Sequence, residues 1–108
     1  MIGRFTIALA ITLTGVLAAP AAGTLDIYWI DVEGGASTLI VTPRGQSVLM
    51  DAGYAGFDDR DPARIERVVT QEAGLKRIDY LVVSHFHPDH AGGLAALSRR
   101  VPTRPASV

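Results

Sequence analysis

The feature that most constrains this chain is a histidine-rich run that directly follows an apolar segment. All three histidines of the 108-residue sequence lie in the run His85-Phe86-His87-Pro88-Asp89-His90. The preceding residues, 78–84, have an almost unbroken apolar middle, which is typical of a β-strand covered on both faces. The sequence therefore predicts a buried strand that delivers the histidine cluster to its own end.

The segment before this strand predicts three further strands in a row. Residues 25–32, 37–42 and 46–51 are rich in β-forming side chains, and glycine-containing breaks at 33–35 and 43–45 separate them. Such short connections favour pairing between successive strands. We expect an antiparallel meander.

Two helices are expected, one before and one after the strand at 78–84 in the sequence. The first begins at Asp61-Pro62, with Asp61 as the N-cap and proline at the first helical position, and ends at Gly74. Its apolar side chains recur at helical spacing: Ile65, Val68, Val69 and Ala73. The second, residues 94–99, would pack through Leu94 and Leu97. The order of elements predicts an α+β fold, a mixed sheet with flanking helices.

The N-terminus has the pattern of a secretory signal peptide. Arg4 precedes an apolar and small-residue run at 5–19, and an alanine-rich stretch follows. We expect residues 1–21 to be removed, with cleavage after Ala21 or Ala22, and the mature protein to be secreted or periplasmic. The alternative is a retained membrane anchor, but a span needs roughly twenty apolar residues and this run is interrupted by threonines and a glycine. No stable membrane span is expected after cleavage.

Cysteine content and charge exclude several classes of protein. The chain has no cysteine, so neither a lipoprotein attachment site nor a disulfide is possible, and stability must come from packing or metal. Without residues 1–21 it carries nine basic and eleven acidic residues, a formal net charge of −2. This charge gives no indication of nucleic-acid binding.

The histidine cluster has the composition and spacing of a metal site. Residues i and i+2 of an extended segment point to the same side, so His85 and His87 can offer two imidazoles to one cation while Phe86 turns inward. Asp89 and His90 follow where the chain turns, which favours two metal ions over one. The alternative is that Asp89 caps the next helix and the histidines are exposed loop residues. The concentration of three scarce residues at one strand end favours the metal site.

These residues match the His-x-His-x-Asp-His motif of the metallo-β-lactamase superfamily. A second similarity is Asp51, which ends an early strand and in that family supports the metal loop; the alternative is a turn-forming Asp-Ala-Gly. Residues 30–43 resemble the opening of the ComEC-type hydrolase domains of competence proteins and of their stand-alone secreted relatives. The resemblance implies a four-layer αββα sandwich, of which residues 22–108 encode the N-terminal αβ half.

The resemblance also implies a chemistry. His85 and His87 would bind a first metal ion, and Asp89 and His90 a second; both ions would usually be zinc, with iron or manganese as alternatives. A hydroxide bridging them would attack an ester, phosphodiester or amide-type bond of a small-molecule or phosphodiester substrate, and Asp89 would orient this nucleophile. The chain is thus expected to belong to an exported metallohydrolase. A class B β-lactamase is a narrower version of the same hypothesis.

One departure from the family pattern limits this expectation. Family members take a further histidine for each metal and a bridging aspartate from their second half, whereas residues 91–108 contain no His, Asp or Glu. We therefore expect a truncated domain that is incomplete and inactive alone, and that needs the missing C-terminal half or a partner chain to complete the site. The alternative function is a non-catalytic metal-binding or interaction fragment.

Overall fold

The computed structural model describes residues 23–104. The predicted signal peptide, residues 1–21, lies outside this range, so its prediction stays untested. Among residues 23–104, none of the helices combines the length and the apolar character needed to cross a membrane.

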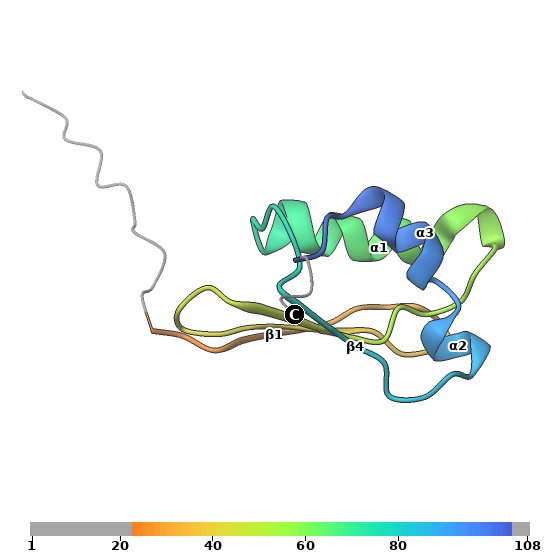
Figure 1. Cartoon of the computed structure of the whole chain (residues 1–108), viewed down its shortest axis with the longest axis horizontal. Helices are drawn as coiled ribbons and strands as arrows, with labels where there is room; N and C mark the ends of the chain where they lie inside the picture. The colour runs from red at the N-terminus through yellow and green to blue at the C-terminus, as the bar shows by residue number, and fades with distance from the viewer. Residues whose placement is uncertain (1–22, 105–108) are drawn as a thin grey trace, which may run out of the picture.

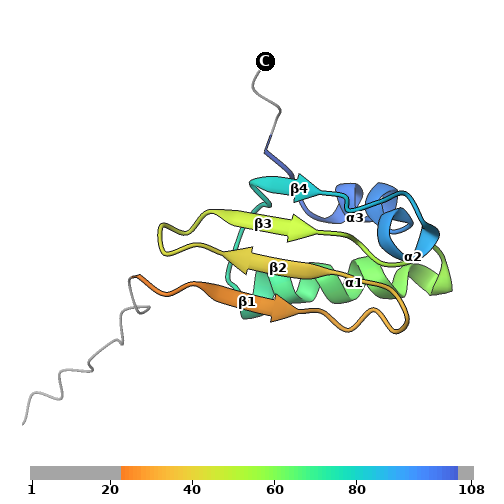
Figure 2. The same ribbon diagram turned by 90° about the horizontal axis from the view of Figure 1, so that it is seen from below.

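Four strands form one sheet in the order β1-β2-β3-β4 (Figure 2). They are β1 (Asp26–Trp29), β2 (Thr38–Val41), β3 (Ser47–Met50) and β4 (Tyr80–Val82). The first three pair antiparallel, which confirms the predicted meander, and β4 runs parallel to β3. Each strand is shorter than predicted. The parallel pair places the carboxyl ends of β3 and β4 at the same edge of the sheet.

The helical elements cover one face of the sheet. A single 3-10 turn (η1, Phe57–Asp59) leads into α1 (Arg60–Arg67), which continues as a π-helical turn (η2, Val68–Glu72); α2 (Pro88–Ala91) and α3 (Leu94–Arg100) come after β4. Figure 1 shows α1 and α3 above the sheet and α2 beside its end. Buried apolar residues fill the space between the layers: Ile30, Val32, Leu39, Leu49, Ala52, Ile65, Val68, Val69, Ile78, Leu97 and Val101. The predicted α+β class, a mixed sheet with flanking helices, is confirmed.

The predicted start of the first helix is wrong by two residues, and the role of Asp61 differs. The helix begins at Arg60, so Asp61 lies inside its first turn and Pro62 follows as the third residue. The Asp61 side chain is buried and accepts a hydrogen bond from the Tyr54 N–H, which lies outside the helix, instead of capping the helix. The predicted stop at Gly74 is correct: its φ of 66° reverses the chain, and the N–H of Leu75 donates to the Val69 carbonyl at 2.9 Å.

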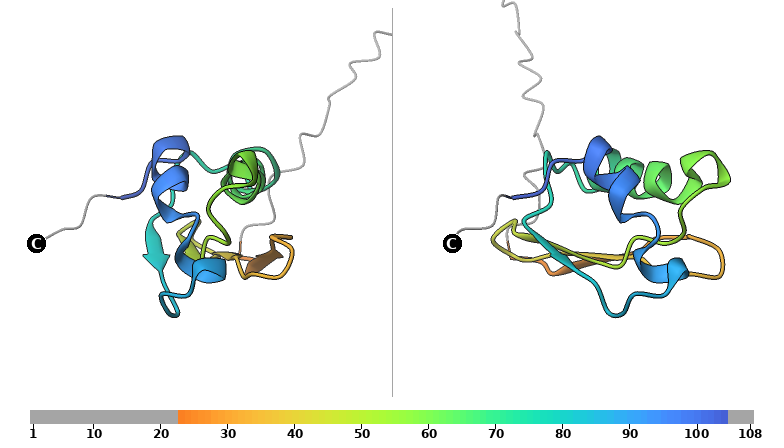
Figure 3. Two further views of the ribbon diagram at one scale, coloured as in Figure 1. Left: turned by 90° about the vertical axis from the view of Figure 1, so that its right-hand side faces the viewer. Right: turned by 45° about the vertical axis from the view of Figure 1, so that its right-hand side comes forward.

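The strand predicted within residues 78–84 is present as β4, but the prediction that it is covered on both faces is wrong. Tyr80, Leu81 and Val82 are 47%, 39% and 40% exposed. Two features of the fold explain this. The strand β4 is the last of the four in the sheet, and α1 and α3 lie on the same side of the sheet, as Figure 3 shows. The opposite face is apolar, and Trp29 on that face is 80% exposed.

Candidate metal centre

The histidine loop, residues 84–90, begins two residues after β4 and lies at the carboxyl end of β3. The backbone N–H of Asp51, the residue that follows β3, donates to the Val82 carbonyl at 2.9 Å. The loop then enters α2, whose N-cap residue is His87. The parallel strand pair therefore brings Asp51 to a loop more than thirty residues away in the sequence.

Three side chains of the loop converge on one point. One ring nitrogen from His85, one from His87 and one carboxylate oxygen of Asp89 all lie within 4.8 Å of one another. The rings of His85 and His87 meet edge to face with centroids 4.7 Å apart. Both histidines are exposed and Asp89 is half-buried, so the cluster is open to solvent. This is a set of two nitrogen donors and one oxygen donor.

His90 lies next to this set, and Asp51 contacts its ring on the side away from the set. Its ring centroid is 4.0 Å from that of His85, and its Nε2 lies 3.5 Å from Oδ2 of Asp89. Its other ring nitrogen, Nδ1, lies 2.8 Å from Oδ2 of Asp51. Nε2 of His90 therefore faces the cluster, while Nδ1 faces the protein interior.

Asp51 is a buried carboxylate beneath the loop. Its residue is 3% exposed, and it accepts hydrogen bonds from the Ser84 N–H at 2.8 Å and the Ser84 hydroxyl at 2.6 Å. Burial by itself raises the pKa of Asp51, but the hydrogen bonds from Ser84 and His90 and the field of His90 outweigh it, so the pKa lies below its usual value. Asp51 thus remains an ionised acceptor at neutral pH.

Two backbone hydrogen bonds fix the far side of the loop. The N–H of Ala36 donates to the Asp89 carbonyl at 3.1 Å, and the N–H of Ala52 donates to the His90 carbonyl at 2.7 Å. Gly35 permits this approach, because a Cβ at this position would overlap the Asp89 carbonyl oxygen. The Glu33–Gly35 turn predicted from the sequence therefore packs directly against a residue of the cluster.

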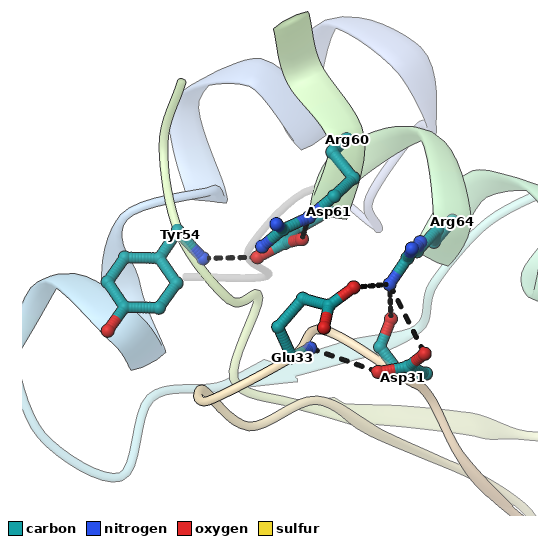
Figure 4. Close-up of polar contacts among 6 residues, drawn as sticks. All are labelled: Asp31, Glu33, Tyr54, Arg60, Asp61 and Arg64. Atoms are coloured by element: carbon teal, nitrogen blue, oxygen red, sulfur yellow. Dashed lines mark hydrogen bonds and ion pairs between the residues drawn. The ribbon is translucent and has the colours of Figure 1, made fainter. Parts of the chain in front are cut away.

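Helix α1 holds the two segments that contact the loop (Figure 4). Asp61 accepts hydrogen bonds from the Tyr54 N–H at 2.8 Å and from Nε of Arg60 at 2.7 Å, which fastens the chain just after Asp51. Arg64 donates to the Asp31 carbonyl and to the Glu33 carboxylate, both at 3.0 Å, which fastens the turn before Gly35. The helix thus fixes both segments that contact the loop.

The structure corrects one detail of the predicted cluster and contradicts one part of the alternative to it. Phe86 does not turn inward: it is 89% exposed, because β4 ends at Val82 and no layer of the described chain lies over the loop. Asp89 does not cap α2, whose N-cap is His87 and which has no side-chain capping bond. The sequence interpretation also missed Ser84, because its hydroxyl contacts Asp51, which lies 33 positions away in the sequence.

The residues present fit a divalent metal ion. Two ligands of a tetrahedral zinc ion at about 2.1 Å lie about 3.4 Å apart. The spread of the three converging donor atoms, at most 4.8 Å, requires movements of about an ångström, which side-chain rotations can supply. Imidazole nitrogen and carboxylate oxygen are both common zinc ligands. The assignment of His85, His87, Asp89 and His90 as ligands, and of Asp51 as their support, stays a prediction.

Comparison with known protein families agrees with this geometry. The family model described as the metallo-beta-lactamase superfamily matches residues 30–108. The chain belongs to this superfamily. It shares 32% identity over 80 residues with a UPF0173 metal-dependent hydrolase of Cupriavidus taiwanensis, an alignment that covers 74% of this chain and 25% of the relative. It also shares 40% identity over 57 residues with a coenzyme F₄₂₀H₂ oxidase of Methanothermobacter marburgensis, covering 53% of this chain and 14% of that protein.

A solved structure gives the same result for the fold. A HARLDQ-motif mutant of the metallo-β-lactamase of Cronobacter sakazakii superposes with a TM-score of 0.55 at 32% identity, covering 72% of this chain and 29% of that chain. The chain therefore spans about a quarter or less of the length of the two curated relatives. Metal-dependent hydrolases are among its relatives in this superfamily, and the finer similarity to ComEC-type domains stays a prediction.

Proposed function

We propose that this chain supplies one set of metal ligands of an exported metallo-β-lactamase-type hydrolase that cleaves an ester, phosphodiester or amide-type bond. The observation that carries the proposal is the convergence of His85, His87 and Asp89 within 4.8 Å at the end of β4. Relatives named as metal-dependent hydrolases support the reaction class. Zinc fits this nitrogen and oxygen donor set, and iron and manganese are the alternatives.

The family resemblance suggests a division of roles, and the positions of the side chains support it. A bound divalent ion supplies a nucleophile by lowering the pKa of water to about 7. His85 and His87 would hold one ion, and His90, whose Nε2 lies 3.5 Å from Asp89, would share a second with that carboxylate. Asp89, as the catalytic residue, would also accept a hydrogen bond from the attacking water and so orient it. Asp51 would keep His90 turned toward the cluster.

We propose that further ligands come from outside the described residues. A catalytic zinc ion usually has three protein ligands, and four residues shared between two ions give only two each. A C-terminal half of the domain, or a partner chain, would supply the others. The apolar sheet face opposite the helices, with Trp29 at 80% exposure, supports the presence of a covering layer in the complete protein.

Metal analysis and hydrolysis assays test the proposal together. We expect the protein purified from its natural host to contain zinc, iron or manganese and to hydrolyse generic esters or phosphodiesters in a chelator-sensitive way. Replacing His87 with asparagine should abolish both metal retention and turnover, whereas the exposed Asp58→Asn variant should retain both. Protein without metal and without chelator-sensitive turnover would contradict the proposal.

The second candidate is a metal-binding or interaction protein without catalysis. It is favoured by one observation: within residues 23–104, all the converging ligands belong to a single loop. The two functions give different results in the same assay. Metal retention that depends on His87, without turnover of any ester, phosphodiester, lactone or lactam, would establish the second function and exclude the first.

Export is a separate part of the proposal and has its own test. The apolar run after Arg4 and the alanine-rich segment that follows it support cleavage after Ala21 or Ala22. Expression in a bacterium with a C-terminal tag should give a periplasmic or secreted protein whose N-terminus, read by mass spectrometry, is residue 22 or 23. An intact N-terminus in the membrane or cytoplasmic fraction would contradict export.

A further inference from the structure

Ser84 places one hydroxyl group between the buried carboxylate and the histidines. Its Oγ lies 2.6 Å from Oδ2 of Asp51, 2.9 Å from Nδ1 of His85 and 3.4 Å from Nδ1 of His90. A hydroxyl has a single proton to donate and two lone pairs that accept. The three neighbours therefore compete for one proton, and the outcome decides which nitrogen of His85 carries hydrogen.

The geometry decides this competition. The 2.6 Å contact has the length of a hydrogen bond from a hydroxyl to a carboxylate, and a carboxylate has no proton to return. Ser84 therefore donates to Asp51, and its oxygen is left to accept from Nδ1–H of His85. The hydrogen then sits on Nδ1 of His85, and Nε2 carries the lone pair that a metal requires.

The same carboxylate also fixes the tautomer of His90, but through a direct hydrogen bond. Oδ2 of Asp51 lies 2.8 Å from Nδ1 of His90, so Nδ1 carries the hydrogen and donates it to the carboxylate. Nε2 then keeps its lone pair for a metal ion, on the side of Asp89. The backbone N–H of Ser84 also donates to Oδ1 of Asp51, which fixes the serine relative to the carboxylate. One buried carboxylate thus orients two histidines, one directly and one through a hydroxyl.

We propose that Ser84 is a positioning residue that relays Asp51 to His85 and fixes the His85 tautomer with Nε2 free to bind the metal. This rests on the metal-binding part of the proposed function, and not on any particular substrate. Ser84 does not itself contact the substrate or the reacting atoms. Its effect is to remove the competing tautomer, in which Nε2 would carry the hydrogen and could not bind a metal without first losing it.

The test uses nitrogen-15 NMR of the histidine rings in the full metal-free chain, followed by zinc titration. We expect His85 of the wild type to carry its hydrogen on Nδ1. Ser84→Ala should shift it toward the Nε2–H form and weaken zinc binding about 10- to 100-fold, and Ser84→Thr, which keeps the hydroxyl, should restore both. Ser98→Ala, which removes a hydroxyl from the exposed side of α3, is the matched control and should change neither.

Two results would overturn the inference. One is a wild-type His85 that carries its hydrogen on Nε2. This measurement uses the wild type alone, so it does not depend on whether a variant folds. The other is weaker zinc binding in Ser84→Ala without a change of tautomer or without rescue by threonine, which would show a merely structural role. Because neither measurement involves turnover, a failure of the relay is distinguishable from a failure of the proposed hydrolase activity.

Discussion

Oδ2 of Asp51 lies 2.8 Å from Nδ1 of His90, although 39 residues separate them in the sequence. The contact exists because β3 and β4 run parallel and end at the same edge of the sheet. Asp51 follows β3, and the histidine loop follows β4. The sheet therefore does more than support the loop: it delivers the acceptor that orients the loop's side chains.

Replacing Asp51 with asparagine should weaken metal binding while keeping the fold. Its amide oxygen can still accept from the Ser84 N–H, but the NH₂ group would then face Ser84 Oγ and Nδ1 of His90, where an acceptor is needed. We expect zinc affinity to fall about 10- to 100-fold. The free energy of unfolding should fall by about 1–3 kcal/mol, the usual cost of an unsatisfied buried polar group. Calorimetric titration and urea unfolding measure the two effects.

The exposed Asp58→Asn variant is the control for this change. It removes one carboxylate, and position 58 already has a φ of 53°, which asparagine tolerates. We expect its zinc affinity and stability to match those of the wild type. Unchanged zinc affinity in Asp51→Asn would show that the Asp51–His90 contact does not orient a ligand.

The glycine pair at positions 34 and 35 offers a matched test of the loop's backbone support. A Cβ at Gly35 would overlap the backbone carbonyl of Asp89, which cannot rotate away, whereas a Cβ at Gly34 would meet no atom within 4 Å. Gly35→Ala should therefore displace Asp89, reduce zinc affinity and lower the free energy of unfolding by about 1–3 kcal/mol. Gly34→Ala should change neither by more than about 0.5 kcal/mol. Equal effects in the two variants would argue against this contact.

Much of the fold could be predicted because its signals are local. Alternating β-formers separated by glycine turns specify the meander, and apolar residues at helical spacing specify α1. The exposure of β4 could not be predicted in this way. An apolar run fits a strand that is buried on both faces, but only the three-dimensional arrangement shows that α1 and α3 lie on the same face.

In the candidate site, too, local patterns could be predicted and long-range contacts could not. The spacing of His85, His87 and Asp89 is a local pattern, so the sequence alone could suggest a metal cluster. Ser84 and Gly35 could not be assigned, because their partners Asp51 and Asp89 lie 33 and 54 positions away and the contacts depend on strand pairing and turn geometry. Asp61 misled the interpretation because an aspartate before proline resembles an N-cap, whereas its carboxylate is buried against Tyr54.

Asp61 should therefore act as a structural anchor and not as a helix cap. Its carboxylate is buried and holds the N–H of Tyr54 and the side chain of Arg60. Asp61→Ala leaves the Tyr54 N–H without this acceptor, and we expect the free energy of unfolding to fall by about 1–3 kcal/mol. Asp31→Asn, at the exposed contact with Arg64, should cost less than about 1 kcal/mol. Urea unfolding of both variants checks the difference, and a larger loss from Asp31→Asn would contradict it.

Asp79 should make the fold sensitive to acid. Its side chain, 12% exposed, accepts hydrogen bonds from the Ser47 N–H at 3.0 Å and from Nε of Arg77 at 3.1 Å. The Ser47 N–H is the main cause of a pKa below the usual 3.8; burial opposes it, and the Arg77 charge and a bond from the Ser47 hydroxyl add to the lowering. Between the lowered pKa of the folded state and pH 3.8, the unfolded chain therefore binds more protons than the folded chain. The stabilisation is complete above pH 3.8 and is lost as the pH falls through the lower folded pKa.

Urea unfolding between about pH 6 and about pH 3, followed by circular dichroism, measures this dependence. We expect Asp79→Asn to be less stable than the wild type at the upper pH and to lose less stability on acidification, because the titrating carboxylate is gone. Asp51, whose pKa is also lowered, contributes an acid dependence of the same sign that should remain in this variant. The exposed Asp58→Asn variant controls for the loss of one surface carboxylate. An acid dependence in Asp79→Asn as steep as that of the wild type would show that the contact between Asp79 and Ser47 does not couple folding to protonation.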